Sequence, residues 1–117
     1  MSKDNEQLKS HVESIAEDIT SPKKEDYEDG EICGHEYLND ALSIEYVISS
    51  DGSFLGAEVL VTFGGPNIVI DTRKELIIGN WWGSHATARF TDNLGLHDIL
   101  EDYYYCTIGS EVSAWNI

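Results

Sequence analysis

Basic residues are scarce in this chain of 117 residues, which has 7 lysines and arginines against 22 aspartates and glutamates and a formal net charge of −15. An excess of this size argues against nucleic acid or an anionic membrane as a direct partner, and it favours a basic surface instead. The excess is uneven, because residues 1–40 hold twelve acids and four lysines. The first third of the chain is therefore its most negative part.

Long hydrophobic runs are missing as well. No stretch approaches the roughly 20 apolar residues that a membrane-spanning helix needs. The start, MSKDNEQLKS, lacks the hydrophobic segment of a secretory signal. These absences predict a cytoplasmic protein. Cysteine is also rare, since Cys33 and Cys106 are the two in the sequence, and we expect both to be free thiols in a reducing compartment.

Established catalytic motifs are absent. The glycines match neither a phosphate-binding loop nor a dinucleotide-binding loop, and neither G-x-S-x-G nor H-E-x-x-H occurs. Ser84 and His85 are adjacent in a predicted strand, so their side chains point apart and do not form a nucleophile–base pair. We expect no enzyme and no catalytic residue.

The candidate for a metal site is the stretch from Cys33 to Glu36, which also contains His35. A structural zinc site needs two such ligand pairs, and the side chains left to complete it, His97 and Cys106, lie far along the chain. We therefore expect no metal and no cofactor. A small metal-binding protein or enzyme of unknown reaction is kept as an alternative.

Residues 4–20 are predicted to form a helix. Apolar side chains recur there at spacings of three and four residues, which places them on one face: Leu8, Val12, Ile15 and Ile19. Pro22 ends this helix, because proline has no amide proton and clashes with the preceding turn. Residues 21–32 follow as an acidic linker, and CGHEYLNDAL fits a short helix before the first strand.

From Ala41 the period changes to two, which predicts strands. The inward side chains expected on the first strand are Leu42, Ile44, Tyr46 and Ile48, and those on the second are Ala57, Val59, Val61 and Phe63. Asp51-Gly52 between them predicts a tight hairpin in which both central residues have positive φ. Gly64 to Asn67 form the next turn, and Ile68 and Ile70 mark a third strand.

A fourth strand with Leu76 and Ile78 runs into Trp81-Trp82, whose rings point to opposite faces, one of them into the core. Gly83-Ser84 forms the following turn, and ATARF forms a short fifth strand. A second helix is expected over residues 94–105. The sequence thus predicts one α+β domain over residues 1–117, an antiparallel four- to five-stranded meander with an N-terminal helix and a C-terminal helix packed on it.

The second helix has an acidic face. Asp92 or Asn93 caps it, and its apolar side is expected to contain Leu96, Ile99, Leu100, Tyr103 and Cys106. Asp98, Glu101 and Asp102 share the other side, beside Tyr105. Three consecutive tyrosines cannot all face the core, so at least one is exposed beside the acids, as binding anchors often are.

These features predict a partner-binding surface made of acids and an aromatic side chain. Its members are Asp98, Glu101, Asp102 and Tyr105 on the second helix and Glu25, Asp26, Glu28 and Asp29 in the linker. Rows of carboxylates imitate a phosphate backbone and compete for the lysines and arginines of a nucleic-acid channel, with strong salt dependence. The alternative is a solvated acidic face that only keeps the protein soluble.

Residues 36–72 (EYLNDALSIEYVISSDGSFLGAEVLVTFGGPNIVIDT) and 78–106 (IGNWWGSHATARFTDNLGLHDILEDYYYC) resemble small acidic proteins of prophages and conjugative elements of Gram-positive bacteria. The first helix and the tail fall outside this resemblance. That group includes anti-CRISPR proteins, several of which block the effector nuclease of type II systems, and anti-restriction DNA mimics. The resemblance implies a bacterial host cell and carries over no active-site residue.

The resulting expectation is a non-catalytic host-defence inhibitor, most concretely an anti-CRISPR protein. It would bind a basic nucleic-acid-binding protein, a CRISPR effector nuclease, and block its nucleic-acid channel with its acidic surface. The alternative is an immunity protein that neutralises a basic nuclease toxin. Net charge does not separate the two hypotheses, because both targets are basic. Genomic neighbourhood separates the two, because an immunity gene lies next to its toxin gene.

Overall fold

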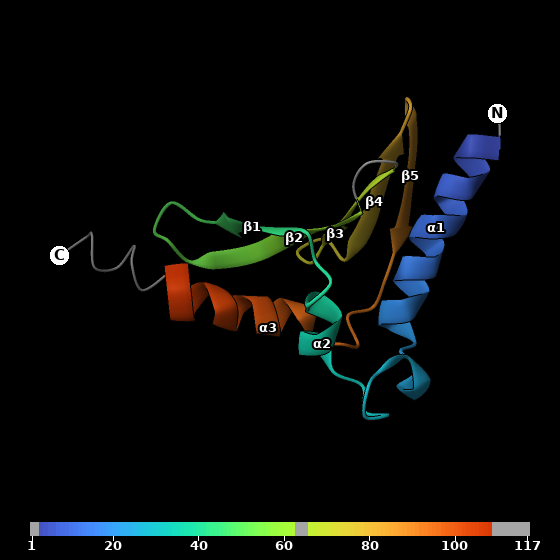
Figure 1. Cartoon of the computed structure of the whole chain (residues 1–117). Helices are drawn as coiled ribbons and strands as arrows, with labels where there is room; N and C mark the ends of the chain where they lie inside the picture. Colours follow the sequence, from blue (N-terminus) through green and yellow to red (C-terminus); the bar gives the residue numbers. More distant parts are fainter. Residues whose placement is uncertain (1–2, 63–65, 109–117) are drawn as a thin grey trace.

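The computed structural model describes residues 3–62 and 66–108 (Figure 1). The helical elements are α1 (Lys3–Thr20), the 3-10 turn η1 (Lys24–Asp26), α2 (Gly34–Leu38), α3 (Leu96–Tyr103) and the π-helical turn η2 (Tyr104–Ile108). The strands are β1 (Ser43–Ile48), β2 (Phe54–Thr62), β3 (Asn67–Asp71), β4 (Leu76–Trp81) and β5 (Ser84–Arg89). They form one antiparallel sheet in the order β1-β2-β3-β4-β5, which confirms the predicted α+β meander with its two flanking helices.

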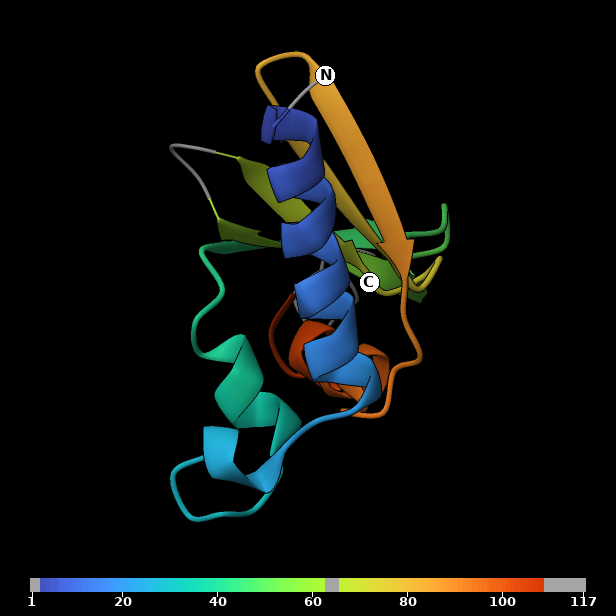
Figure 2. The same ribbon diagram turned by 90° about the vertical axis from the view of Figure 1, so that its right-hand side faces the viewer.

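The helices divide the sheet between them. α1 packs on β4 and β5, α3 packs on β2, and α2 contacts α3. Figures 1 and 2 show a strongly twisted sheet whose two halves are covered in this way, with α2 and η1 together at one end of the molecule. The twist lets two helices that point in different directions cover one continuous sheet.

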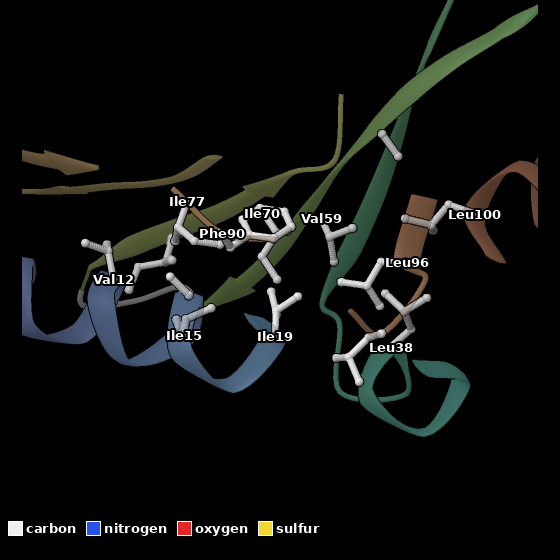
Figure 3. Packing of buried hydrophobic residues seen from close by; sticks show 14 of the residues in the cluster. Val12, Ile15, Ile19, Leu38, Val59, Ile70, Ile77, Phe90, Leu96 and Leu100 are labelled. Carbon is white, nitrogen blue, oxygen red and sulfur yellow. The ribbon is translucent and has the colours of Figure 1, made fainter. Parts of the chain in front are cut away.

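The core forms where these helices meet the sheet (Figure 3). The predicted apolar face of α1 is confirmed, since Leu8 is 1% exposed and Val12 and Ile19 are fully buried. β4 provides the room for α1 at Gly79, where an added Cβ would lie 2.7 Å from Val12 Cγ1. Ile77 of the same strand is also fully buried, so α1 lies directly on β4.

The other face of the sheet carries an apolar row in register. Leu60 of β2 pairs with Val69 of β3, which pairs with Ile78 of β4. Cross-strand partners lie on the same face, and all three side chains are half-buried. This row therefore lies opposite the buried Ile70 and Ile77.

The first hairpin is confirmed, but its predicted turn is wrong. Gly52 has a φ of 89°, whereas Asp51 has no positive φ. The Gly52 amide donates to the Ser49 carbonyl at 3.0 Å, and the Ser49 amide donates to the Ser53 carbonyl at 2.9 Å. Ser50 and Asp51 are thus the central residues, and glycine follows them, which is the arrangement of a longer hairpin loop.

The expected double positive φ occurs instead at the β4–β5 hairpin. Trp81 pairs with Ser84, so Trp82 and Gly83 form a two-residue turn with φ values of 51° and 81°. The predictions of a Gly83-Ser84 turn and of a tryptophan pair within a strand are therefore wrong. Neither ring is fully buried: Trp81 is half-buried and Trp82 is 84% exposed.

Two side chains expected to face inward on the first strand are exposed. Leu42 lies just before β1 and is 58% exposed, and Ile48 is 42% exposed. A register shift between Val47 and Ile48 interrupts the alternation at that end of the strand. Phe63 and the glycines of the turn predicted at Gly64 to Asn67 lie outside the described residues.

The C-terminal helix α3 begins at Leu96, two residues later than predicted, with Gly95 at its N-cap position. Its first amides are still satisfied by the predicted Asp92. Its two carboxylate oxygens accept hydrogen bonds from the amides of Leu96 and His97 at 2.8 and 2.9 Å. The apolar face then differs from the expectation, because Cys106 is exposed and Tyr104 is fully buried. The helix widens to a π-helical turn from Tyr104 onward, so each later residue rotates less around the axis than in an α-helix.

Candidate functional site

An acidic pocket of about 410 Å³ opens between the end of α1, η1 and α2. Figure 2 shows η1, α2 and the last turn of α1 together at one end of the molecule, and the residues that line the pocket come from this end. Its lining consists of carboxylates and tyrosines from these separate segments: Asp18, Asp26, Tyr27, Glu36, Tyr37 and Asp40. The fold thus concentrates charge of one sign around one hollow.

Local sequence features build the pocket walls. α1 ends at Thr20, ahead of Pro22 as predicted, and the chain reverses through η1. Within the 21–32 linker, Tyr27 is only 8% exposed and fixes the segment to the core. Glu36 of α2 and Asp40, two residues beyond the end of α2, both line the pocket. The Glu36 carboxylate also accepts the Glu28 amide at 3.1 Å, which ties the linker to α2.

The electrostatics of the pocket raise the pKa of three of its side chains, Asp18, Tyr27 and Tyr37. Burial raises the pKa of Asp18, the nearby Asp26 carboxylate raises that pKa further, and Lys23 partly offsets both effects. Burial likewise raises the pKa of Tyr37, and Asp18 adds to this rise. The pKa of Tyr27 is raised first by burial and then by Asp26, Asp18 and Glu36. A positive charge in the pocket would stabilise the ionised form of each of these groups and lower its pKa.

Replacing Asp18 by asparagine is expected to raise Tm slightly at pH 7, because solvent screens much of the repulsion at this exposed side chain. The folded protein binds the Asp18 proton more tightly than the unfolded chain, because its pKa in the fold exceeds the ordinary 3.8. The free energy of unfolding therefore falls as pH rises from the pKa of Asp18 in the unfolded chain to its higher pKa in the folded protein. Above that range the loss is complete and stays constant. Calorimetry across pH should show the advantage of Asp18→Asn vanish below about pH 3.8.

The control is Asp29→Asn, which removes one charge from an exposed position outside the pocket lining. Equal stabilisation by both substitutions would mean that general charge repulsion, and not the pocket, causes the effect.

The predicted partner-binding residues are only partly brought together. Asp26 lines the pocket, while Glu25, Glu28 and Asp29 lie exposed in the same linker. The acids of α3 form a separate group that does not line the pocket: Asp98 and Asp102 are exposed and Glu101 is half-buried. The predicted residues are therefore divided between the pocket, the exposed part of the linker and the α3 face.

Tyr105 is exposed as expected, at 45%. It also has a structural role, because its hydroxyl accepts the Phe54 amide at 3.0 Å and its ring packs edge-on against Tyr104 at 5.0 Å. Tyr103 is half-buried, so the three consecutive tyrosines divide between core and surface.

The residues weighed for catalysis or metal binding are not brought together. Ser84 is half-buried and His85 is exposed, with its Nδ1 2.9 Å from the Asn80 side-chain oxygen. His35 packs against Tyr103 at a centroid distance of 5.9 Å. In residues 3–62 and 66–108, no group of three or more histidine, cysteine, aspartate or glutamate side chains is placed to hold a metal ion.

Trp82 is the functional candidate that the sequence left unassigned. Its φ of 51° is unusual for a bulky residue, because the left-handed region places Cβ close to the following carbonyl. At 84% it is the most exposed large apolar side chain among the residues described. The two-residue turn imposes this φ, and the exposed ring that it presents is of the type enriched in interfaces.

The predicted partner-binding surface also left out five pocket members: Asp18, Tyr27, Glu36, Tyr37 and Asp40. Of these, Glu36 was considered from the sequence only as a metal ligand. Their spacing carries no signal, because the six lining residues come from separate segments that only the fold brings together.

The fold and this site define a small acidic α+β protein with a carboxylate- and tyrosine-lined pocket. No family model, curated protein or solved structure matches the chain. Over the residues that the structure describes, no helix has the length and apolar character needed to cross a membrane.

Proposed function

We propose that this protein is a non-catalytic inhibitor of host defence, most concretely an anti-CRISPR protein that binds a CRISPR effector nuclease in a bacterial cell. The observation that carries the proposal is the convergence of Asp18, Asp26, Glu36 and Asp40 on one pocket. In a protein with a net charge of −15 this pocket fits a basic surface that otherwise contacts phosphates.

Two further features support a binding protein. The α3 face adds Asp98 and Asp102 as a second exposed acidic region, and such extended acidic surfaces compete with nucleic acid for lysines and arginines. Trp82 projects from the hairpin at the end of β4 with 84% of its surface exposed. Tryptophan is among the side chains most enriched in interface hot spots.

The purified protein, at a near-stoichiometric ratio, is expected to stop DNA cleavage by a susceptible effector nuclease. The inhibition should weaken when salt is raised from about 50 to about 200 mM, because exposed charges are then screened. The measurement is cleavage of a labelled target across a panel of type II effectors. Undiminished cleavage by every effector of the panel would overturn the proposal.

Variants locate the interface in the same assay. Loss of inhibition in a folded Asp98→Ala/Glu101→Ala/Asp102→Ala variant would place the partner on α3, whereas loss in Asp18→Asn/Asp26→Asn would place it on the pocket. Trp82→Asn keeps the fold, since asparagine followed by glycine is the preferred pair for this turn. A loss of inhibition in that variant therefore reports on the exposed ring.

A further inference from the structure

The pocket receives the hydroxyl end of a mostly buried side chain, Tyr27. Tyr27 lines the pocket although only 8% of it is exposed. Within residues 3–62 and 66–108 its hydroxyl has no hydrogen-bond partner. In that same part of the chain no fully inaccessible side-chain oxygen or nitrogen is without a partner. The hydroxyl therefore opens into the pocket, toward Asp26, Asp18 and Glu36, whose charges act on it.

The chemistry of the lining selects a positively charged donor. Ionised carboxylates only accept hydrogen bonds, and Asp18, Asp26, Glu36 and Asp40 supply all the charged groups of the lining. The tyrosine rings add apolar faces on which a cation can stack. Neutral ligands and anions would leave this cluster of like charges uncompensated.

The lining fits an organic cation better than a metal ion. The carboxylates do not converge on one point that could hold a metal in the described part of the structure. A planar guanidinium, in contrast, has five donors spread over a fork and stacks on aromatic rings. A pocket of about 410 Å³ lies within the usual range for ligand sites and admits such a group with its alkyl stem.

We infer that this pocket receives the guanidinium group of one arginine side chain presented by a protein partner, with Asp18 and Asp26 accepting its hydrogen bonds and Tyr27 and Tyr37 flanking it. The inference deepens the proposed function and rests on its basic partner. It adds a defined anchor to what is otherwise diffuse charge attraction.

The test needs no partner protein. N-acetyl-arginine amide is titrated into the ¹⁵N-labelled full chain, and N-acetyl-citrulline amide serves as its neutral analogue of the same shape. We expect saturable shifts of the Tyr27, Glu36 and Tyr37 amides with a Kd on the order of 1 mM, as a few charge-assisted hydrogen bonds provide. Citrulline amide should bind at least about tenfold more weakly.

Matched variants separate the pocket from general acidity. Asp18→Asn is expected to weaken arginine-amide binding about tenfold without loss of stability. Glu6→Gln removes one charge from an exposed position near the start of α1 and should leave the Kd unchanged. Equal binding of citrulline amide, equal effects of the two variants, or unsaturable shifts spread over all acidic segments would each overturn the inference.

The outcome is distinguishable from that of the inhibition assay. Specific arginine binding without inhibition of any effector would support the pocket as an arginine site and contradict the proposed anti-CRISPR function. Inhibition without arginine binding would support the proposed function and show that this pocket does not anchor the partner.

Discussion

Replacing Tyr104 by alanine is expected to destabilise the fold by about 3–5 kcal/mol, the range for deleting a large buried aromatic side chain. Tyr104 is fully buried. Its ring centroid lies 5.5 Å from Tyr46 and 6.0 Å from Phe54, and its hydroxyl donates to the Gly52 carbonyl at 2.7 Å. One side chain thus joins the end of α3 to the first hairpin and its loop.

Urea denaturation of Tyr104→Ala and Tyr104→Phe would measure the two contributions separately. Phenylalanine keeps the ring and loses the hydrogen bond to Gly52, so it should cost only about 1 kcal/mol. Tyr103→Ala is the neighbouring control, because Tyr103 is half-buried and should have an intermediate effect. A loss below about 1 kcal/mol for Tyr104→Ala would contradict the described packing of α3 on the hairpin.

Periodicity predicted most of the fold because each strand and helix buries one face. Leu8, Val12 and Ile19 are spaced for a helix and are buried along one side of α1. Ile68 and Ile70 are spaced for a strand and are both fully buried. In these elements the local spacing of apolar residues agrees with their burial in the fold, so they could be predicted without knowledge of contacts between distant parts of the chain.

The turns were harder because turn type depends on where the strand pairing stops. Asp51-Gly52 has the composition of a two-residue turn, yet pairing ends at Ile48 and Phe54 and leaves a longer loop. Pairing continues to Trp81 and Ser84 in the other hairpin, which forces a tryptophan into a left-handed conformation. Neither endpoint is visible in the local sequence.

The pocket could not be predicted from spacing, because its parts come from three segments. Asp18 belongs to the exposed side of α1, where it looks like any solvated acid. Only the reversal at Pro22 and the burial of Tyr27 place it opposite Glu36 and Tyr37. The chain direction after a helix end is set by tertiary packing, which periodicity does not report.

Gly34 allows α2 to pack closely against the segment before α3, and this packing positions the α2 residues that line the pocket. A Cβ added at Gly34 would lie 2.5 Å from the Leu94 carbonyl oxygen and 2.6 Å from Ile99 Cδ1. The Ile99 side chain can rotate away, but the carbonyl belongs to the backbone that leads into α3. Gly34→Ala is therefore expected to cost about 2–3 kcal/mol, as overpacking of a close contact does.

The same substitution should also weaken arginine-amide binding, although no pocket residue is changed. α2 can relieve the clash only by moving away from Leu94, and it carries Glu36 and Tyr37 with it. Urea denaturation and the amide titration on Gly34→Ala measure both effects. Asn39→Ala, at the exposed far end of α2, should change stability by less than about 0.5 kcal/mol and leave binding intact. Unchanged binding in a destabilised Gly34→Ala would mean that the pocket holds its shape independently of the α2–α3 contact.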